Sequence, residues 1–140
     1  MIINLTNKNI IAVNPLFALD FFTRTRGMIF KKFDGFDAMV FSHCNCIHTM
    51  FMQMHLDVIF VDYDNKICAL HQLRPWLPFV RVPKARTVIE LPSGTIQTTK
   101  PAIGNVLNID AEVIDDEFSE MSDFISTSDL IIPINVEKKK

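Results

Sequence analysis

The residues best suited to chemistry in this chain form a cluster of thiol, imidazole and thioether side chains near residue 50. These groups suit Cu(I) or Zn. The cluster consists of His43, Cys44, Cys46, His48, Met50, Met52 and Met54. If residues 46–54 formed one strand, Cys46, His48 and Met50 would project from one face about 6–7 Å apart in steps of two residues. A tetrahedral site would still need a ligand from elsewhere, and Met and Cys are ordinary core residues. We therefore predict core packing, with metal binding as the alternative and no cofactor.

A second candidate is the single tryptophan, Trp76, which lies among three prolines in residues 74–83. Proline interrupts central strands and helix interiors, so this segment is expected to be an ordered loop, pinned by Trp76 and Phe79. With Arg74 and Arg81 nearby, Trp76 could form the rim of a ligand or partner site. A lone Trp on a rigid loop is more often a lid over the core, which is the alternative we favour.

The common catalytic and nucleotide-binding motifs are missing from the sequence. There is no P-loop and no G-x-G-x-x-G, and the only serine in such a context, in Pro92-Ser93-Gly94, does not fit G-x-S-x-G. Asp62, Asp64 and Asn65 alternate as in part of a calcium loop, but the later Gly and Glu of an EF-hand are absent. We predict a solvated turn there and no catalytic residue.

Hydrophobic patterning predicts many short strands and one helix. The helix is expected over residues 17–28 and ends at Gly27. The expected strands cover residues 2–5, 10–13, 36–41, 46–54, 56–61, 67–73, 85–91 and 106–109. The predicted fold class is mainly β (α+β), an antiparallel β-sandwich or barrel-like domain with one short N-terminal helix.

The chain of 140 residues is 49% hydrophobic and 21% charged, which excludes a mainly disordered protein. Residues 1–110 carry eleven Lys/Arg and eight Asp/Glu, whereas residues 111–140 carry three Lys and eight Asp/Glu, so the charges are +3 and −5. We predict a β domain over 1–110 and an acidic C-terminal extension over 111–140, partly ordered or docked. Neither of these two net charges favours nucleic-acid binding, which requires a basic patch.

The location of the protein is predicted from its cysteines and its N-terminus. Three cysteines do not make an even disulfide framework, so reduced thiols are expected. No apolar run reaches the ~20 residues of a membrane-spanning helix, and the N-terminus has no signal-peptide pattern. We expect a cytoplasmic protein without a transmembrane segment; its oligomeric state is not predicted.

Several short sequence groups occur together in a distinctive order. They are Arg26-Gly27-Met28, residues 46–52 (CIHTMFM), residues 56–62 (LDVIFVD), Pro75-Trp76, Ala85, residues 88–95 (VIELPSGT) and Gly104. Over roughly residues 12–110 the sequence resembles the bacterial and archaeal family called domain of unknown function 192. The resemblance implies a small β-sandwich-like or barrel-like fold with one helix and no assigned activity. Family members are often exported, which stands against the cytoplasmic expectation.

The resemblance also marks recurrent polar positions within otherwise apolar elements: Arg26, His48, Thr49, Asp57 and Glu90. A buried charge is costly unless it is paired, so Asp57 needs a partner, for which Arg26 or His48 is the obvious candidate. A His–Asp pair could act as a general base, or it could fix the packing of the core. Burial with every hydrogen bond satisfied would favour a structural network, and an open pocket would favour a site.

We therefore predict a small, non-enzymatic β domain that binds an unknown small ligand or protein. The predicted ligand-binding residues are Arg26, His48, Thr49, Asp57, Trp76 and Glu90. The alternative is a metal-binding protein (Zn or Cu) or a hydrolase-like enzyme that uses His48 and Asp57. A third possibility is that the acidic extension docks on a basic partner or on the protein's own body.

Overall fold

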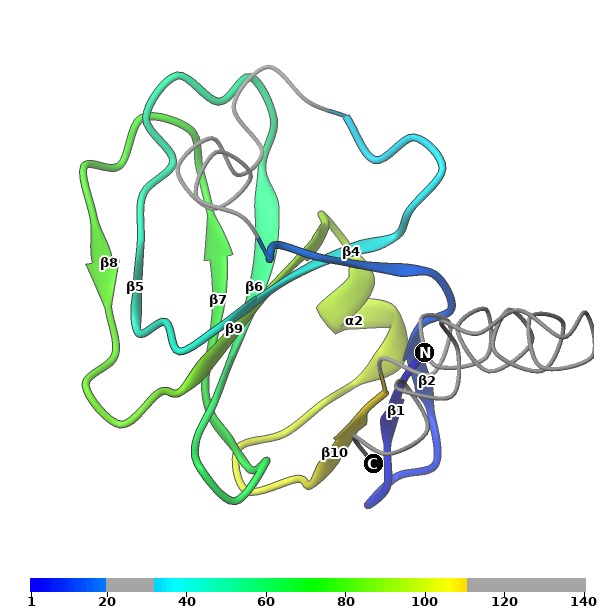
Figure 1. The fold of residues 1–140 in the computed structure, drawn as a ribbon. Coiled ribbons are helices and arrows are strands. Elements are labelled where there is room, and N and C mark those ends of the chain that lie inside the picture. Colours follow the sequence, from blue (N-terminus) through cyan, green and yellow to red (C-terminus); the bar gives the residue numbers. More distant parts are fainter. Residues whose placement is uncertain (20–31, 111–140) are drawn as a thin grey trace, which may run out of the picture. The chain divides into compact units, whose positions relative to one another are not determined.

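The fold is built on a five-stranded sheet, seen in the computed structural model, which describes residues 1–19 and 32–110 (Figure 1). The strand order is β3-β4-β9-β6-β7. These strands are β3 (Pro15–Phe17), β4 (Ala38–Ser42), β9 (Thr87–Pro92), β6 (Leu56–Val61) and β7 (Ile67–Leu73). β3 and β4 are parallel and the other neighbours are antiparallel. The helix expected over residues 17–28 lies mostly outside the described residues. Its expected first residue, Phe17, belongs to β3 instead.

The centre of this sheet confirms the clearest sequence predictions. All six residues of β6 are buried, which is why residues 56–61 are almost continuously apolar. β7 pairs with β6 as the antiparallel partner that the turn at residues 62–66 predicted. β9 lies on the other side of β6, and four of its six residues are buried.

Two smaller sheets complete the described strands. One has the order β10-β1-β2, from β1 (Ile2–Asn4), β2 (Ile10–Ala12) and β10 (Leu107–Ile109), which confirms the predicted hairpin at the N-terminus. The other pairs β5 (Cys46–Ile47) with β8 (Val80–Arg81). The predicted mainly β fold is confirmed. Within residues 1–19 and 32–110 no sheet closes into a barrel.

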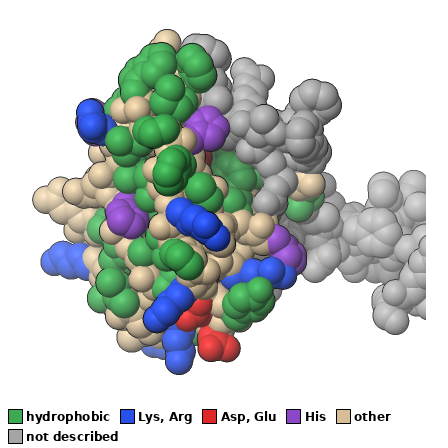
Figure 2. Space-filling model, turned by 90° about the vertical axis from the view of Figure 1, so that its left-hand side faces the viewer, with side chains coloured by type: hydrophobic (Ala, Val, Ile, Leu, Met, Phe, Trp, Pro, Cys, Tyr) green, Lys and Arg blue, Asp and Glu red, His purple; other side chains and the backbone are tan. Residues whose placement is uncertain are grey.

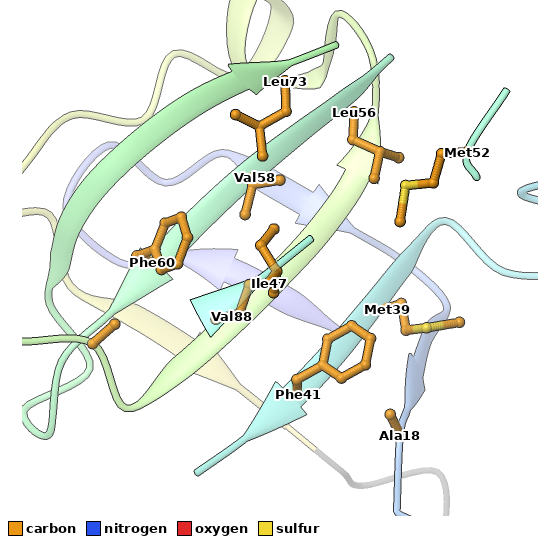
Figure 3. Close-up of a cluster of buried hydrophobic side chains, with 11 residues drawn as sticks. Ala18, Met39, Phe41, Ile47, Met52, Leu56, Val58, Phe60, Leu73 and Val88 are labelled. Atoms are coloured by element: carbon orange, nitrogen blue, oxygen red, sulfur yellow. The ribbon is translucent and has the colours of Figure 1, made fainter. Parts of the chain in front are cut away.

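The five-stranded sheet separates two hydrophobic cores, because successive side chains of a strand point to opposite faces. Leu56, Val58 and Phe60 of β6 belong to the first core, in which Ile47 and Met52 also pack (Figure 3). Ile59 and Val61 belong to the second core. That core is completed by the three-stranded sheet, through Ile2, Ile11, Ala12 and Leu107. Any buried polar residue of β6 or β9 therefore belongs to one core or the other.

The predicted strand over residues 46–54 is wrong beyond Ile47. A turn follows, in which the Met52 N–H donates to the Thr49 carbonyl over 3.2 Å and Phe51 has a left-handed backbone (φ 64°). Cys46, His48 and Met50 consequently do not lie on one face of a strand, and the spacing that suggested a metal site is lost. The described part of the chain contains no group of three or more His, Cys, Asp or Glu placed to hold a metal ion.

Three further observations concern the cysteines, a short helix and the expected absence of a membrane-spanning helix. The three cysteines are free thiols, as expected. A short helix that the sequence did not predict, α2 (Thr95–Thr99), begins after Gly94, whose φ of 95° suits glycine. Five residues are too few to show a hydrophobic period. No helix within the described ranges is long and apolar enough to cross a membrane.

Candidate functional site

Two loops that are far apart in sequence, residues 48–55 and 74–79, are joined through Thr49. Thr49 is fully buried. Its hydroxyl donates to the Arg74 carbonyl and accepts from the Leu77 N–H, each over 2.8 Å. Its backbone accepts from the Trp76 N–H over 2.8 Å and donates to the Leu77 carbonyl over 3.0 Å. Thr49 therefore holds the proline-rich loop, which corrects the expectation that Trp76 and Phe79 pin it, since these are 58% and 70% exposed.

An open hollow of about 630 Å³ lies between the two loops and is called the loop hollow. Its lining is formed by Phe51, Met52, Gln53, His55, Arg74, Pro75 and Trp76. This volume lies within the range of small-molecule sites. Met52 connects the hollow to the first core, since it is buried there (Figure 3). The side of the molecule that carries β5 and β8 shows basic and histidine side chains among hydrophobic ones, with most of the visible acidic surface at its lower edge (Figure 2).

The rim of the loop hollow carries a pair of exposed aromatic rings. The centroids of Phe51 and Trp76 lie 5.2 Å apart with the planes at 64°, an edge-to-face contact. Both residues have left-handed backbones, with φ of 64° and 67°, which is unusual for bulky side chains and costs roughly 1–2 kcal/mol each. Because Trp76 is more than half exposed, it forms a rim. The alternative of a lid over the core does not agree with the structure.

Asp57, the predicted partner of Arg26 or His48, is engaged elsewhere. It is fully buried on β6, and its Oδ2 accepts a hydrogen bond of 2.7 Å from the Ile96 N–H in the first turn of α2. Its Oδ1 and the Nδ1 of His48 are buried and have no hydrogen-bond partner among the described residues. The expected His48–Asp57 hydrogen bond is therefore absent from this part of the chain, and Arg26 lies outside it.

Glu90 lies on the opposite face of the sheet from Asp57. It is paired in register with Met39 on one side and Val58 on the other, and both belong to the first core. Glu90 is 2% exposed, and its Oε2 has no hydrogen-bond partner among the described residues. Burial raises the pKa of Glu90 to about 8, since an apolar environment disfavours the charged form.

The structure thus brings together only part of the predicted set. Thr49 and Trp76 are joined by a backbone hydrogen bond, and Trp76 lines the loop hollow. His48 is next to Thr49 in the chain, whereas Asp57 accepts a hydrogen bond from α2 and Glu90 lies within the first core. Phe51, Gln53 and His55 also line the hollow and were not among the predicted site residues. The available signal was their alternation with Thr49, because residues two apart point to the same side of an extended segment.

The family model DUF192, described as "Uncharacterized ACR", matches residues 3–109. The chain belongs to the DUF192 family. This result confirms the resemblance seen in the sequence, and it extends the match to the N-terminal hairpin.

Two archaeal relatives of this DUF192 protein carry the name UPF0127 protein. The one from Thermococcus sibiricus (strain DSM 12597 / MM 739) is 31% identical over 118 residues, which covers 80% of this chain and 76% of the relative. The one from Pyrococcus horikoshii is 34% identical over 91 residues, which covers 61% and 77%. A crystal structure of a protein of unknown function from Novosphingobium aromaticivorans DSM 12444 has the same fold, with a TM-score of 0.59, 17% identity and coverage of 68% and 74%. The function of the family is uncharacterised.

Proposed function

We propose that this DUF192 domain is a binding module whose ligand lies in the loop hollow, against Phe51 and Trp76. The observation that carries the proposal is the aromatic pair itself. Two half-exposed rings are in contact although both backbones are strained, and hydrogen bonds to the buried Thr49 support the loop that carries Trp76. Such strain persists only where the surroundings enforce it, and it is concentrated at ligand sites.

The lining of the loop hollow has the composition of a binding site. Phe51, Trp76 and Met52 offer apolar contact area, and a few polar groups that fix orientation are typical of small-molecule sites. Gln53, His55 and Arg74 supply these groups from two different loops. Because the loops are held by Thr49, a ligand would not have to order them, which favours affinity.

The same lining argues against a catalytic centre. Among the described residues it contains no Ser, Thr, Cys, Asp or Glu, so these residues offer neither a hydroxyl or thiol nucleophile nor a carboxylate to orient His55. The alternative hydrolase-like site needs His48 and Asp57 to act together. Asp57 instead accepts from the Ile96 N–H, and nothing within the described residues joins it to His48.

The experiment uses Trp76 as a reporter, because it is the only tryptophan in the chain. Its fluorescence would be titrated with a set of small ring compounds that includes cationic, neutral and anionic members. We expect at least one compound to change the emission saturably in the wild-type protein and to lose this effect in Phe51→Ala. Ile103→Ala is the control, since Ile103 is 70% exposed in the loop that contacts the opposite end of β7. If no compound gave a saturable change, or if Phe51→Ala left binding unaltered, the proposal would be overturned.

A further inference from the structure

We infer that the ligand of the loop hollow is a small organic anion, in which a carboxylate or phosphate ester is attached to a flat or apolar body. This inference rests on the proposed binding function and names the chemistry of the ligand.

The first observation is the charge of the two loops together with the residues that flank them, of whose cations Arg74 lines the hollow. Residues 43–56 contain three histidines and no charged residue of either sign, and residues 74–86 contain four Lys/Arg and no Asp or Glu. These segments therefore carry +4 with histidine neutral, in a chain whose net charge is −2. A region with one sign of charge attracts ligands of the opposite sign and raises their local concentration.

The second observation is the position of the cation in the lining. Arg74 is exposed, and none of the described residues that line the hollow with it is acidic. Arg86, by contrast, lies over the Tyr63 ring at 4.7 Å and donates to its hydroxyl over 3.2 Å. The planar guanidinium of Arg74 matches a carboxylate or phosphate in a two-point hydrogen bond. Gln53 and His55 add further polar groups to the same lining.

The third observation is the apolar remainder of the hollow. Phe51, Trp76, Met52 and Pro75 make up more than half of the described residues that line it. An inorganic anion would leave these side chains without contact. Aromatic rings bind flat or apolar groups through area burial and ring contacts. The ligand that uses both parts of the hollow therefore has an acidic end and an apolar end, and a volume of about 630 Å³ accommodates a small molecule.

The test compares four probes by the fluorescence of Trp76: phenyl phosphate, phenylacetate, benzyl alcohol and inorganic phosphate. We expect at least one ring-bearing anion to bind about tenfold or more tightly than benzyl alcohol, as one charge-assisted contact would provide. Added salt should weaken that binding, and inorganic phosphate should bind more weakly than phenyl phosphate. Arg74→Gln should remove the preference for the anion. Lys66→Gln should keep it, since Lys66 is an exposed cation before the far end of β7.

Equal affinity for benzyl alcohol and the anions, or a preference that persists in Arg74→Gln, would overturn the inference while leaving the hollow as a binding site. Inorganic phosphate binding as tightly as phenyl phosphate would overturn the apolar end of the ligand. Vesicles of anionic phospholipid that change the emission of Trp76 where phenyl phosphate and phenylacetate do not would assign the surface to membranes, which also overturns the inference. The proposed function itself is overturned by its own test, in which no compound of the wider set binds or Phe51→Ala leaves binding unaltered.

Discussion

The rings of Phe51 and Trp76 meet edge to face with their centroids 5.2 Å apart, although both residues have positive φ and lie on loops separated by β6 and β7. The contact thus combines a favourable ring interaction with unfavourable backbone conformations. Because the two effects have different physical origins, substitutions at one residue can separate them.

Phe51→Gly and Phe51→Ala are predicted to differ in stability. Both remove the ring, but glycine adopts positive φ at no steric cost, whereas alanine keeps the penalty of its Cβ. We expect the free energy of unfolding, measured by urea denaturation, to be higher for the glycine variant by about 1 kcal/mol. Both variants should lose ligand binding at Trp76. An alanine variant as stable as the glycine variant would show that the backbone of Phe51 is not strained.

Thr49→Val is predicted to destabilise the domain and to loosen the loop that carries Trp76. The variant keeps the shape of the side chain but leaves the Arg74 carbonyl and the Leu77 N–H without the hydroxyl that now serves both. Loss of these bonds should cost about 2–4 kcal/mol in the free energy of unfolding. Thr49→Ser is the control, because it retains the hydroxyl and should recover most of the loss. Equal destabilisation by Val and Ser would assign the effect to packing.

How far the sequence could predict the fold is clear from two neighbouring segments. Residues 56–61 were recognised because a strand buried on both faces must be apolar throughout, and β6 is buried at every position. Residues 46–54 alternate as an amphipathic strand does, yet only Cys46–Ile47 pair. The hydrogen bonds of Thr49 with residues 74–77 bend the chain there. Contacts so distant in sequence leave no local pattern.

The candidate site was predictable to a similar extent. The sequence marked Asp57 as a buried acid that needs a partner, but the partner is a backbone N–H of α2. Every residue except proline has a backbone N–H, so the residue type does not show which N–H is the donor. Trp76 was recognised because of its surroundings of proline and arginine. Phe51 was not, since its aromatic type is also that of an ordinary strand residue.

Asp57→Ala is predicted to destabilise α2. Without the carboxylate, the Ile96 N–H loses its acceptor, at a cost of about 2–3 kcal/mol in the free energy of unfolding. Asp57→Asn keeps an acceptor oxygen and should cost about 1 kcal/mol or less. Hydrogen exchange at the Ile96 amide, followed by NMR, should be faster in the alanine variant than in the asparagine variant. An unchanged exchange rate in Asp57→Ala would remove the structural role assigned to this residue.

Glu90 is predicted to make the stability of the domain depend on pH. Its pKa in the folded state is about 8, above the roughly 4.3 of an exposed glutamate. Between these values the folded state holds a proton that the unfolded state has lost, so stability falls as the pH rises. We expect this group to lower the free energy of unfolding by up to roughly 1 kcal/mol per pH unit between pH 5 and 8. Below pH 4 and above pH 9, Glu90 should no longer change the free energy of unfolding with pH.

Glu90→Gln tests this prediction, because glutamine is neutral at every pH and similar in size. The variant should be more stable than the wild-type protein at pH 8, with a flatter dependence of unfolding free energy on pH between 5 and 8. Asp64→Asn is the matched control, since Asp64 is an exposed carboxylate in the turn between β6 and β7 and its removal should leave the slope intact. Parallel stability curves for the wild-type protein and Glu90→Gln would mean that Glu90 is ionised in the folded state, and hence paired with a cation.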